Sequence, residues 1–404
     1  MLAAATNASA RELELSVDGR VGGDSNILRR AEDEIEDGFF ELSPKVRVRE
    51  SSDALNYDLF YRPTYQTFFD TSGVDGFDHR AEGEVAWSID PKQMLGVSAS
   101  YLNARRLRFD SDVASGPNIF EVSDRERLQR TAVDAYYQHQ LTERLLGRAS
   151  VAFDDYDYRR NLNFDSRGFT GQLYGQYAVD SRLSLGLTGT ARRRITAPVT
   201  GTGGDVVTRS TTRIASTTDV FSLGASVNWQ VTPTFRASVQ AGPSLIISRQ
   251  RPDSRQFAAG TRFTRESDVT VFAQASATKE WDRANLDVSY VRSESRGAGT
   301  SSSSISDLVN VAYGRALTHR WYLRLNGSWD QREQILKILG GSRLKVTQYR
   351  TQGTLSYRLT RQWQVIGQYA FVRQERDQFF GTSDTIHAHT GFLSLRYTFD
   401  PIPF

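Results

Sequence analysis

Hydrophobic and polar residues alternate with period two along most of this chain. A clear example lies at residues 390–399. One face of this segment carries Leu393, Leu395, Tyr397 and Phe399, and the other carries Phe392, Ser394, Arg396 and Thr398. Side chains alternate in this way between the two faces of a β-strand. The pattern therefore predicts a strand with one apolar face, suited to lipid, and one polar face.

About eighteen segments of this kind follow one another. They centre on residues 13–21, 40–48, 55–61, 85–89, 95–101, 133–137, 149–153, 173–179, 183–187, 221–229, 235–239, 269–275, 286–290, 309–313, 321–325, 355–359, 363–371 and 390–399. This repeated alternation predicts an all-β fold. The expected architecture is a transmembrane antiparallel up-and-down β-barrel of about 16–18 strands whose first strand pairs with its last. We expect residues 11–404 to form this single barrel.

Short polar turns alternate with longer connections between these segments. The short turns lie at residues 90–92, 141–144, 179–182, 231–234, 281–283, 317–321 and 359–363, and the longer connections at 25–37, 110–123, 196–215, 250–264, 293–304, 337–345 and 376–385. Trp229, Trp281, Trp321 and Trp363 all lie beside short turns. Short turns on one rim, longer loops on the other and an aromatic girdle are typical of bacterial outer-membrane barrels.

Composition narrows the class of protein further. Hydrophobic residues make up only 39% of the 404 residues, and the mean hydropathy is −0.48, which excludes a bundle of membrane helices. Cysteine is absent, as suits the oxidising envelope of a Gram-negative cell. Period-two strands also build soluble β-helices, propellers and sandwiches. Long strands, alternating loop lengths and the tryptophan pattern favour the outer membrane over those soluble folds.

The first ten residues differ from the rest of the chain. They lack a basic start and a long apolar stretch, but they end in Ala8-Ser9-Ala10, which is a small-x-small cleavage pattern. Residues 1–10 are interpreted either as the remnant of a signal peptide or as a disordered N-terminus.

The residues that usually carry catalysis or bind metals are sparse. The five histidines are His79, His139, His319, His387 and His389, and no carboxylate cluster accompanies the last two. No nucleophile elbow or phosphate-binding loop is present. The net charge is +3 and the pI is about 9.0, but the arginines are spread along strands rather than gathered with aromatic residues. We therefore expect no enzyme activity, no cofactor, no metal and no nucleic-acid partner.

The charged residues indicate which strand face lines the lumen. A charge that faces lipid at the membrane midplane costs about 2–4 kcal/mol, so the charged face should be the inner one. The candidates for a basic lumen lining are Lys45, Arg47, Arg62, Arg236, Arg324, Arg350, Arg358 and Arg396. They predict a mild preference for anions, including acidic polysaccharides, unless cross-strand pairing with Asp and Glu neutralises them.

Short motifs at both ends of the chain resemble a known family. Residues Val21-Gly22-Gly23-Asp24-Ser25-Asn26-Ile27, Leu42-Ser43-Pro44-Lys45-Val46 and the segment 393–399 are similar to outer-membrane β-barrel porins often encoded beside exopolysaccharide genes. The tail that follows Phe399 departs from the family, so either Phe399 or Phe404 would serve the barrel-assembly machinery. The resemblance implies a pore in the Gram-negative outer membrane, in contact with its lipids and lipopolysaccharide, and implies polysaccharide or an export complex as further partners.

Two functions remain open at this point. The first is a pore for polysaccharide export or for diffusion of charged small solutes, because about eighteen strands enclose a water-filled channel. The second is a barrel with a closed lumen that acts as an outer-membrane enzyme or as an adhesin through its loops. The pore is favoured because the sequence contains no recognisable plug or external domain.

Overall fold

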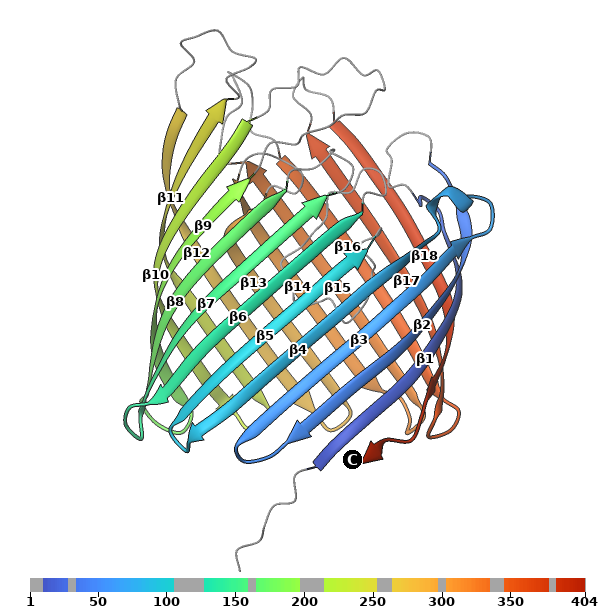
Figure 1. The fold of residues 1–404 in the computed structure, drawn as a ribbon, viewed down its shortest axis with the longest axis horizontal. Helices are drawn as coiled ribbons and strands as arrows, with labels where there is room; N and C mark the ends of the chain where they lie inside the picture. Colours follow the sequence, from blue (N-terminus) through green and yellow to red (C-terminus); the bar gives the residue numbers. More distant parts are fainter. Residues whose placement is uncertain are drawn as a thin grey trace, which may run out of the picture.

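Antiparallel strands form one closed barrel in the computed structural model (Figure 1). The structure describes residues 10–27, 34–104, 127–158, 165–196, 214–252, 264–296, 303–334, 345–377 and 383–403. The strands are β1 (Ala10–Asp24), β2 (Asp37–Ser51), β3 (Leu55–Phe68), β4 (Gly76–Asp90), β5 (Gln93–Ala104), β6 (Leu128–Gln140), β7 (Leu145–Tyr158), β8 (Ser166–Ala178), β9 (Leu183–Thr196), β10 (Ile214–Thr232), β11 (Phe235–Pro252), β12 (Thr264–Trp281), β13 (Ala284–Arg296), β14 (Ser303–Ala316), β15 (Trp321–Gln334), β16 (Lys345–Arg358), β17 (Trp363–Asp377), β18 (Ser383–Thr398) and β19 (Ile402–Pro403).
Strands β1–β18 make the wall, so the predicted fold class is confirmed.

The barrel closes between its first and last long strands, as the sequence predicts. Strands β1 and β18 pair in antiparallel fashion from Ser16 opposite Thr398 to Asp24 opposite Thr390. The tail after β18 continues this seam, because Leu13 lies opposite Ile402 in β19 and the Phe399 N–H donates to the Leu15 carbonyl oxygen at 2.9 Å. The tail therefore lengthens the pairing with β1. Phe404 lies outside the described residues.

A belt of apolar side chains covers the outer surface of the barrel. Residues such as Leu173, Leu187, Leu223 and Leu393 are exposed on the strand face that the alternation assigns to lipid. Trp229, Trp281, Trp321 and Trp363 are 39–52% exposed beside short turns, and the rings of Trp321 and Tyr357 lie 4.6 Å apart. Strand pairing around the barrel satisfies backbone groups that lipid cannot, and an apolar belt with an aromatic girdle matches the membrane. The protein is an outer-membrane barrel of a Gram-negative bacterium.

Four of the short turns share one hydrogen-bond pattern. The side-chain oxygens of Thr142, Asp180, Thr318 and Thr360 each accept hydrogen bonds from the backbone N–H groups two and three residues later, at 2.6–3.3 Å. The side chain thus satisfies donors that the tight turn leaves unpaired. The donors from Arg182 and Leu183 lower the pKa of the Asp180 carboxyl. The predicted short turns are all confirmed at one rim of the barrel.

The connections at the other rim fall wholly or partly outside the described residues, except for residues 69–75, which contain the short helix η1 (Ser72–Val74). In the part of the chain that the structure describes, no helix is long and apolar enough to cross a membrane. The predicted signal remnant at residues 1–10 also lies outside that part, apart from Ala10. Strand β1 begins at Ala10, one residue before the predicted start of the barrel.

The residues of the N-terminal motif pack on the inside of the barrel. Ile27 is 1% exposed and clusters with Phe39 and Phe68 from the inner faces of β2 and β3. The side-chain amide of Asn26 donates to the carbonyl oxygen of His387 on β18 at 3.1 Å. Gly22 permits this packing, since a Cβ there would lie 2.3 Å from the Gly391 carbonyl oxygen. The motif thus fastens the chain after β1 across the closure seam.

Candidate functional site in the barrel lumen

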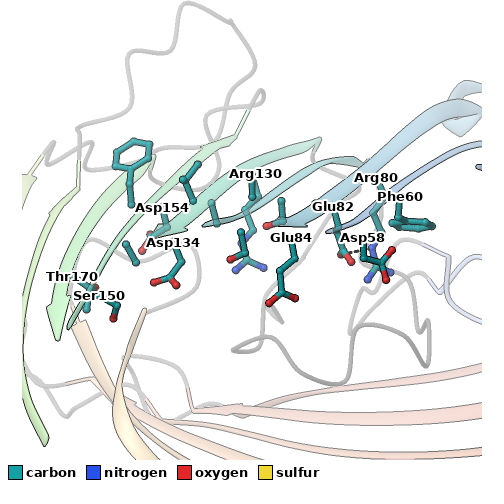
Figure 2. A pocket seen from close by; sticks show the side chains of 18 of the residues that line it. Asp58, Phe60, Arg80, Glu82, Glu84, Arg130, Asp134, Ser150, Asp154 and Thr170 are labelled. Carbon is teal, nitrogen blue, oxygen red and sulfur yellow. Dashed lines mark hydrogen bonds and ion pairs between the residues drawn. The ribbon is translucent and has the colours of Figure 1, made fainter. Parts of the chain in front are cut away.

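A cavity of about 690 Å³ lies against the inner wall formed by β2–β9. Figure 2 shows labelled charged side chains, such as Glu84 and Asp134, that project from neighbouring strands into the interior of the barrel. The charged residues that line it are Lys45, Arg47, Asp58, Arg80, Glu82, Glu84, Arg130, Asp134, Asp154 and Arg192. The lining therefore contains both cationic and anionic groups, and it is suited to water and charged solutes rather than to an apolar ligand.

Strand register places these charges in rows that cross the wall. Arg62 lies opposite Arg80, and this row continues through Leu102 to Arg130. The acidic row begins where Asp58 lies opposite Glu84, and it continues through Ser98 to Asp134. Residues directly opposite each other on paired strands have neighbouring side chains. The wall therefore presents a row of arginines close to a row of carboxylates.

Some of these charges neutralise each other within the wall. The Nε of Arg47 donates to Oδ1 of Asp58 at 2.7 Å, and the Nε of Arg80 donates to Oε1 of Glu82 at 2.7 Å. The Arg80 guanidinium also lies 5.6 Å from the centre of the Phe60 ring. Such contacts hold long side chains against the wall and keep the interior open.

Two carboxylates of the cavity are differently placed. Among the described residues, Glu84 and Asp134 form no ion pair, and Figure 2 shows both pointing into the open space. They are free to contact mobile cations or the positively charged part of a solute. This part of the lumen therefore offers groups of either sign to a passing molecule.

The wall formed by β15–β18 has a different chemistry. The inner face of these strands carries Arg324, Arg332, Arg350, Arg358 and Arg396, and Asp330 is the one carboxylate among the inner side chains that the structure places there. Asp330 accepts a hydrogen bond from Arg332 at 2.6 Å. Amides and hydroxyls fill much of the remaining inner face, namely Asn326, Ser328, Gln348, Gln352, Thr354, Ser356, Gln364, Gln368, Gln374, Thr390 and Ser394. This wall is cationic and rich in hydrogen-bonding groups.

The eight candidates from the sequence are spread over several parts of the inner surface. Lys45 and Arg47 line the cavity, and Arg62 lies beside it in register with Arg80. Arg324, Arg350 and Arg358 lie on β15 and β16. Arg236 forms an exposed ion pair with Glu280 on β12, and Arg396 donates to Asp18 across the closure seam at 2.9 Å. The structure thus brings only two of the eight into the cavity.

The selection of basic residues missed much of the cavity lining. Arg130 and Asp154 line the cavity, and they lie on the same face of their strands as the chosen residues. The alternation pattern was the available signal for them. It identifies the inner face of each strand, but it does not show where along the barrel axis a cavity forms.

Comparison with known proteins gives matches to solved structures. No protein-family model matches the chain, and no curated protein matches it. The ferric-catecholate import receptor Fiu of E. coli K12, in its open form, is 10% identical with a TM-score of 0.47, covering 95% of this chain and 81% of the receptor. OccK2 (OpdF) of Pseudomonas aeruginosa in complex with glucuronate is 12% identical with a TM-score of 0.45, covering 98% of both chains. OccAB4 of Acinetobacter baumannii is 11% identical with a TM-score of 0.43, covering 97% of this chain and 98% of OccAB4.

Proposed function

We propose that this protein is a hydrated channel for charged small solutes, with a preference for anions. The observation that carries the proposal is the charged inner wall of an 18-strand barrel, which surrounds a cavity of about 690 Å³. Barrels of 16–18 strands are wide enough to leave an aqueous channel. Fixed charges on such a wall concentrate ions of the opposite sign.

The chemistry of the β15–β18 wall supports acidic sugars as the solute class. Guanidinium groups bind carboxylates, and amides and hydroxyls form hydrogen bonds with sugar hydroxyl groups. The Nε2 atoms of Gln352 and Gln374 are buried and have no hydrogen-bond partner in the described part of the chain, so they are donors that a solute or water can satisfy. A carboxylate-bearing polysaccharide presents the same groups, and its export is the form of this function that the family resemblance implies.

Liposome swelling tests the proposed function. Liposomes that contain the purified, folded barrel are diluted into isotonic arabinose, galacturonate, glucosamine or a large dextran. We expect swelling in arabinose, faster swelling in galacturonate than in glucosamine, and no swelling in dextran, because the lumen admits small solutes and its β15–β18 wall attracts anions. Protein-free liposomes control for leakage. Absence of swelling in every sugar, with protein that still shows the heat-modifiable migration of a folded barrel, would contradict the proposal.

A further inference from the structure

The barrel wall is split at one place between β12 and β13. The pairing of β11 with β12 extends to Gln250 opposite Thr264, whereas the pairing of β12 with β13 stops at Ala273 opposite Arg292. Beyond that point β13 still pairs with β14, up to Arg296 opposite Ser303. The part that is not paired with β12 consists of residues 293–296 of β13 and their partners, residues 303–306 of β14. It is here called the β13–β14 end.

The β13–β14 end lies inside the barrel. Val288 and Val311, which lie nearer the short-turn rim on these strands, are exposed on the outer surface. The alternation of side chains assigns Glu294 and Ile305 to the same outer face. Glu294 is nevertheless only 7% exposed, and Ile305 packs against Val220 and Ile246. Both of those residues belong to the inner faces of β10 and β11. The outer face of the β13–β14 end therefore packs on the inner face of the nearby wall segment formed by β10 and β11.

Glu294 is held there by two arginines of β9. Its Oε1 accepts a hydrogen bond from Nη1 of Arg194 at 2.7 Å, and its Oε2 accepts one from Nη1 of Arg192 at 3.3 Å. Arg192 also lines the lumen cavity, and its Nε donates to the Thr170 hydroxyl at 3.2 Å. The Nε of Arg194 is buried and has no partner among the described residues. Two guanidinium groups thus converge on one carboxylate, with a donor still unused.

We propose that Arg192 and Arg194 form an anion-binding site of the lumen and that Glu294 occupies it as an internal ligand. The solute that replaces Glu294 carries a carboxylate, as an acidic oligosaccharide does; this choice of solute rests on the proposed function. Hydrogen bonds between a guanidinium and a carboxylate are charge-assisted and stronger than those between neutral groups. The cavity that Arg192 already lines gives a solute carboxylate its approach to the site.

Replacement of Glu294 also changes the wall. The β13–β14 end then loses its ion pairs with β9, while it keeps the packing of Ile305 on β10 and β11 and the pairing of β14 with β15. Strand β13 can resume pairing with β12, and continuation of the present register would place Phe272 opposite Ser293. Binding of the anion therefore shifts the β13–β14 end from the lumen towards the wall, since a ligand favours the state for which it has the higher affinity.

Calorimetric titration of the detergent-solubilised barrel tests the site without requiring conduction. The probe is trigalacturonate, and uncharged maltotriose is the control sugar. We expect Glu294→Gln to bind trigalacturonate about tenfold more tightly than the wild type, because the site no longer contains its own carboxylate. Arg194→Gln should abolish binding, whereas Arg167→Gln, which removes an outer-surface ion pair with Asp155, should leave it unchanged. Equal affinities of Glu294→Gln and wild type, or equal binding of both sugars, would overturn the proposal.

Paired cysteines test the movement, and the chain has no cysteine of its own. Ile246→Cys with Ile305→Cys should form a disulfide when the β13–β14 end lies inside, and Phe272→Cys with Ser293→Cys should form one when β13 rejoins β12. We expect trigalacturonate to reduce the yield of the first disulfide and to raise that of the second, with maltotriose having no effect. Yields that do not respond to trigalacturonate would refute the movement. A barrel that passes both tests but fails liposome swelling would disprove the channel while retaining the site.

Discussion

Replacing Asp18 by Asn should destabilise the folded barrel by about 2–3 kcal/mol. Asp18 lies at the closure seam and accepts hydrogen bonds from Arg20 at 3.1 Å and Arg396 at 2.9 Å, and from the Ser394 hydroxyl. The Asp18 and Arg20 side chains are each only 9% exposed. Removal of one partner from a buried ion pair leaves the other charge uncompensated, which costs about 3–5 kcal/mol. The smaller loss is expected because Arg20 keeps Glu41, 3.5 Å away.

Urea unfolding in detergent, followed by tryptophan fluorescence and by the heat-modifiable gel shift, measures this loss. Glu280→Gln is the matched control, because it also removes a carboxylate from an ion pair on the inner face. Its partner Arg236 is 59% exposed and Glu280 is 50% exposed, so the change should cost less than about 1 kcal/mol. An Asp18 variant no less stable than this control would show that the seam does not depend on the buried charges.

Replacing Arg324, Arg350 and Arg358 together by Gln should lower the ratio of chloride to potassium permeability roughly threefold. The three arginines lie on the inner face of β15 and β16, where Asp330 is the one carboxylate among the side chains that the structure places on the β15–β18 wall. Gln keeps much of the length and hydrogen bonding of Arg and removes its charge. The local excess of anions near this wall should therefore fall.

The opposite change serves as the control for this prediction. Replacing Glu84 by Gln and Asp134 by Asn removes two carboxylates that form no ion pair in the described structure and that point into the cavity. This double variant should raise the chloride preference. Reversal potentials under a salt gradient give the permeability ratio for each variant. If all variants shared the wild-type ratio, the walls would not set the selectivity.

The strand order, the short turns and the closure of the barrel could be predicted because each depends on local chemistry. Alternation fixes which face of a strand meets lipid, and side chains such as Thr318 and Thr360 build tight turns from their own neighbours. The pairing of β1 with β18 follows once every strand has an apolar outer face, since a closed barrel leaves no edge unpaired.

The cavity and the β13–β14 end could not be predicted in the same way. The alternation of side chains places Lys45 and Arg358 on the same inner surface of the barrel. The distance between them depends on the circumference of the barrel and the tilt of its strands. Glu294 and Ile305 share the parity of the lipid-facing valines, and only the departure of β13 from β12 turns them inward. The charges of Arg292, Glu294 and Asp307 at lipid-facing positions were the signs in the sequence that this part of β13 and β14 does not face lipid.

The packing of Asn26 and Ile27 across the closure seam could not be predicted from the sequence either. The sequence identifies them only as part of a motif that resembles a family. Their partners lie on β2, β3 and β18, and the contact between Asn26 and His387 joins residues 361 positions apart. Such long-range packing becomes visible only when the barrel has closed.

Single-channel recording in planar bilayers tests the central claim, a hydrated lumen for charged solutes, most directly. Wild-type protein with the heat-modifiable migration of a folded barrel should insert with discrete conductance steps, and its reversal potential in a potassium chloride gradient should indicate a mild preference for chloride. Folded protein that inserts into the bilayer, as shown by its resistance to extraction with carbonate, yet gives no conductance steps would contradict an open lumen.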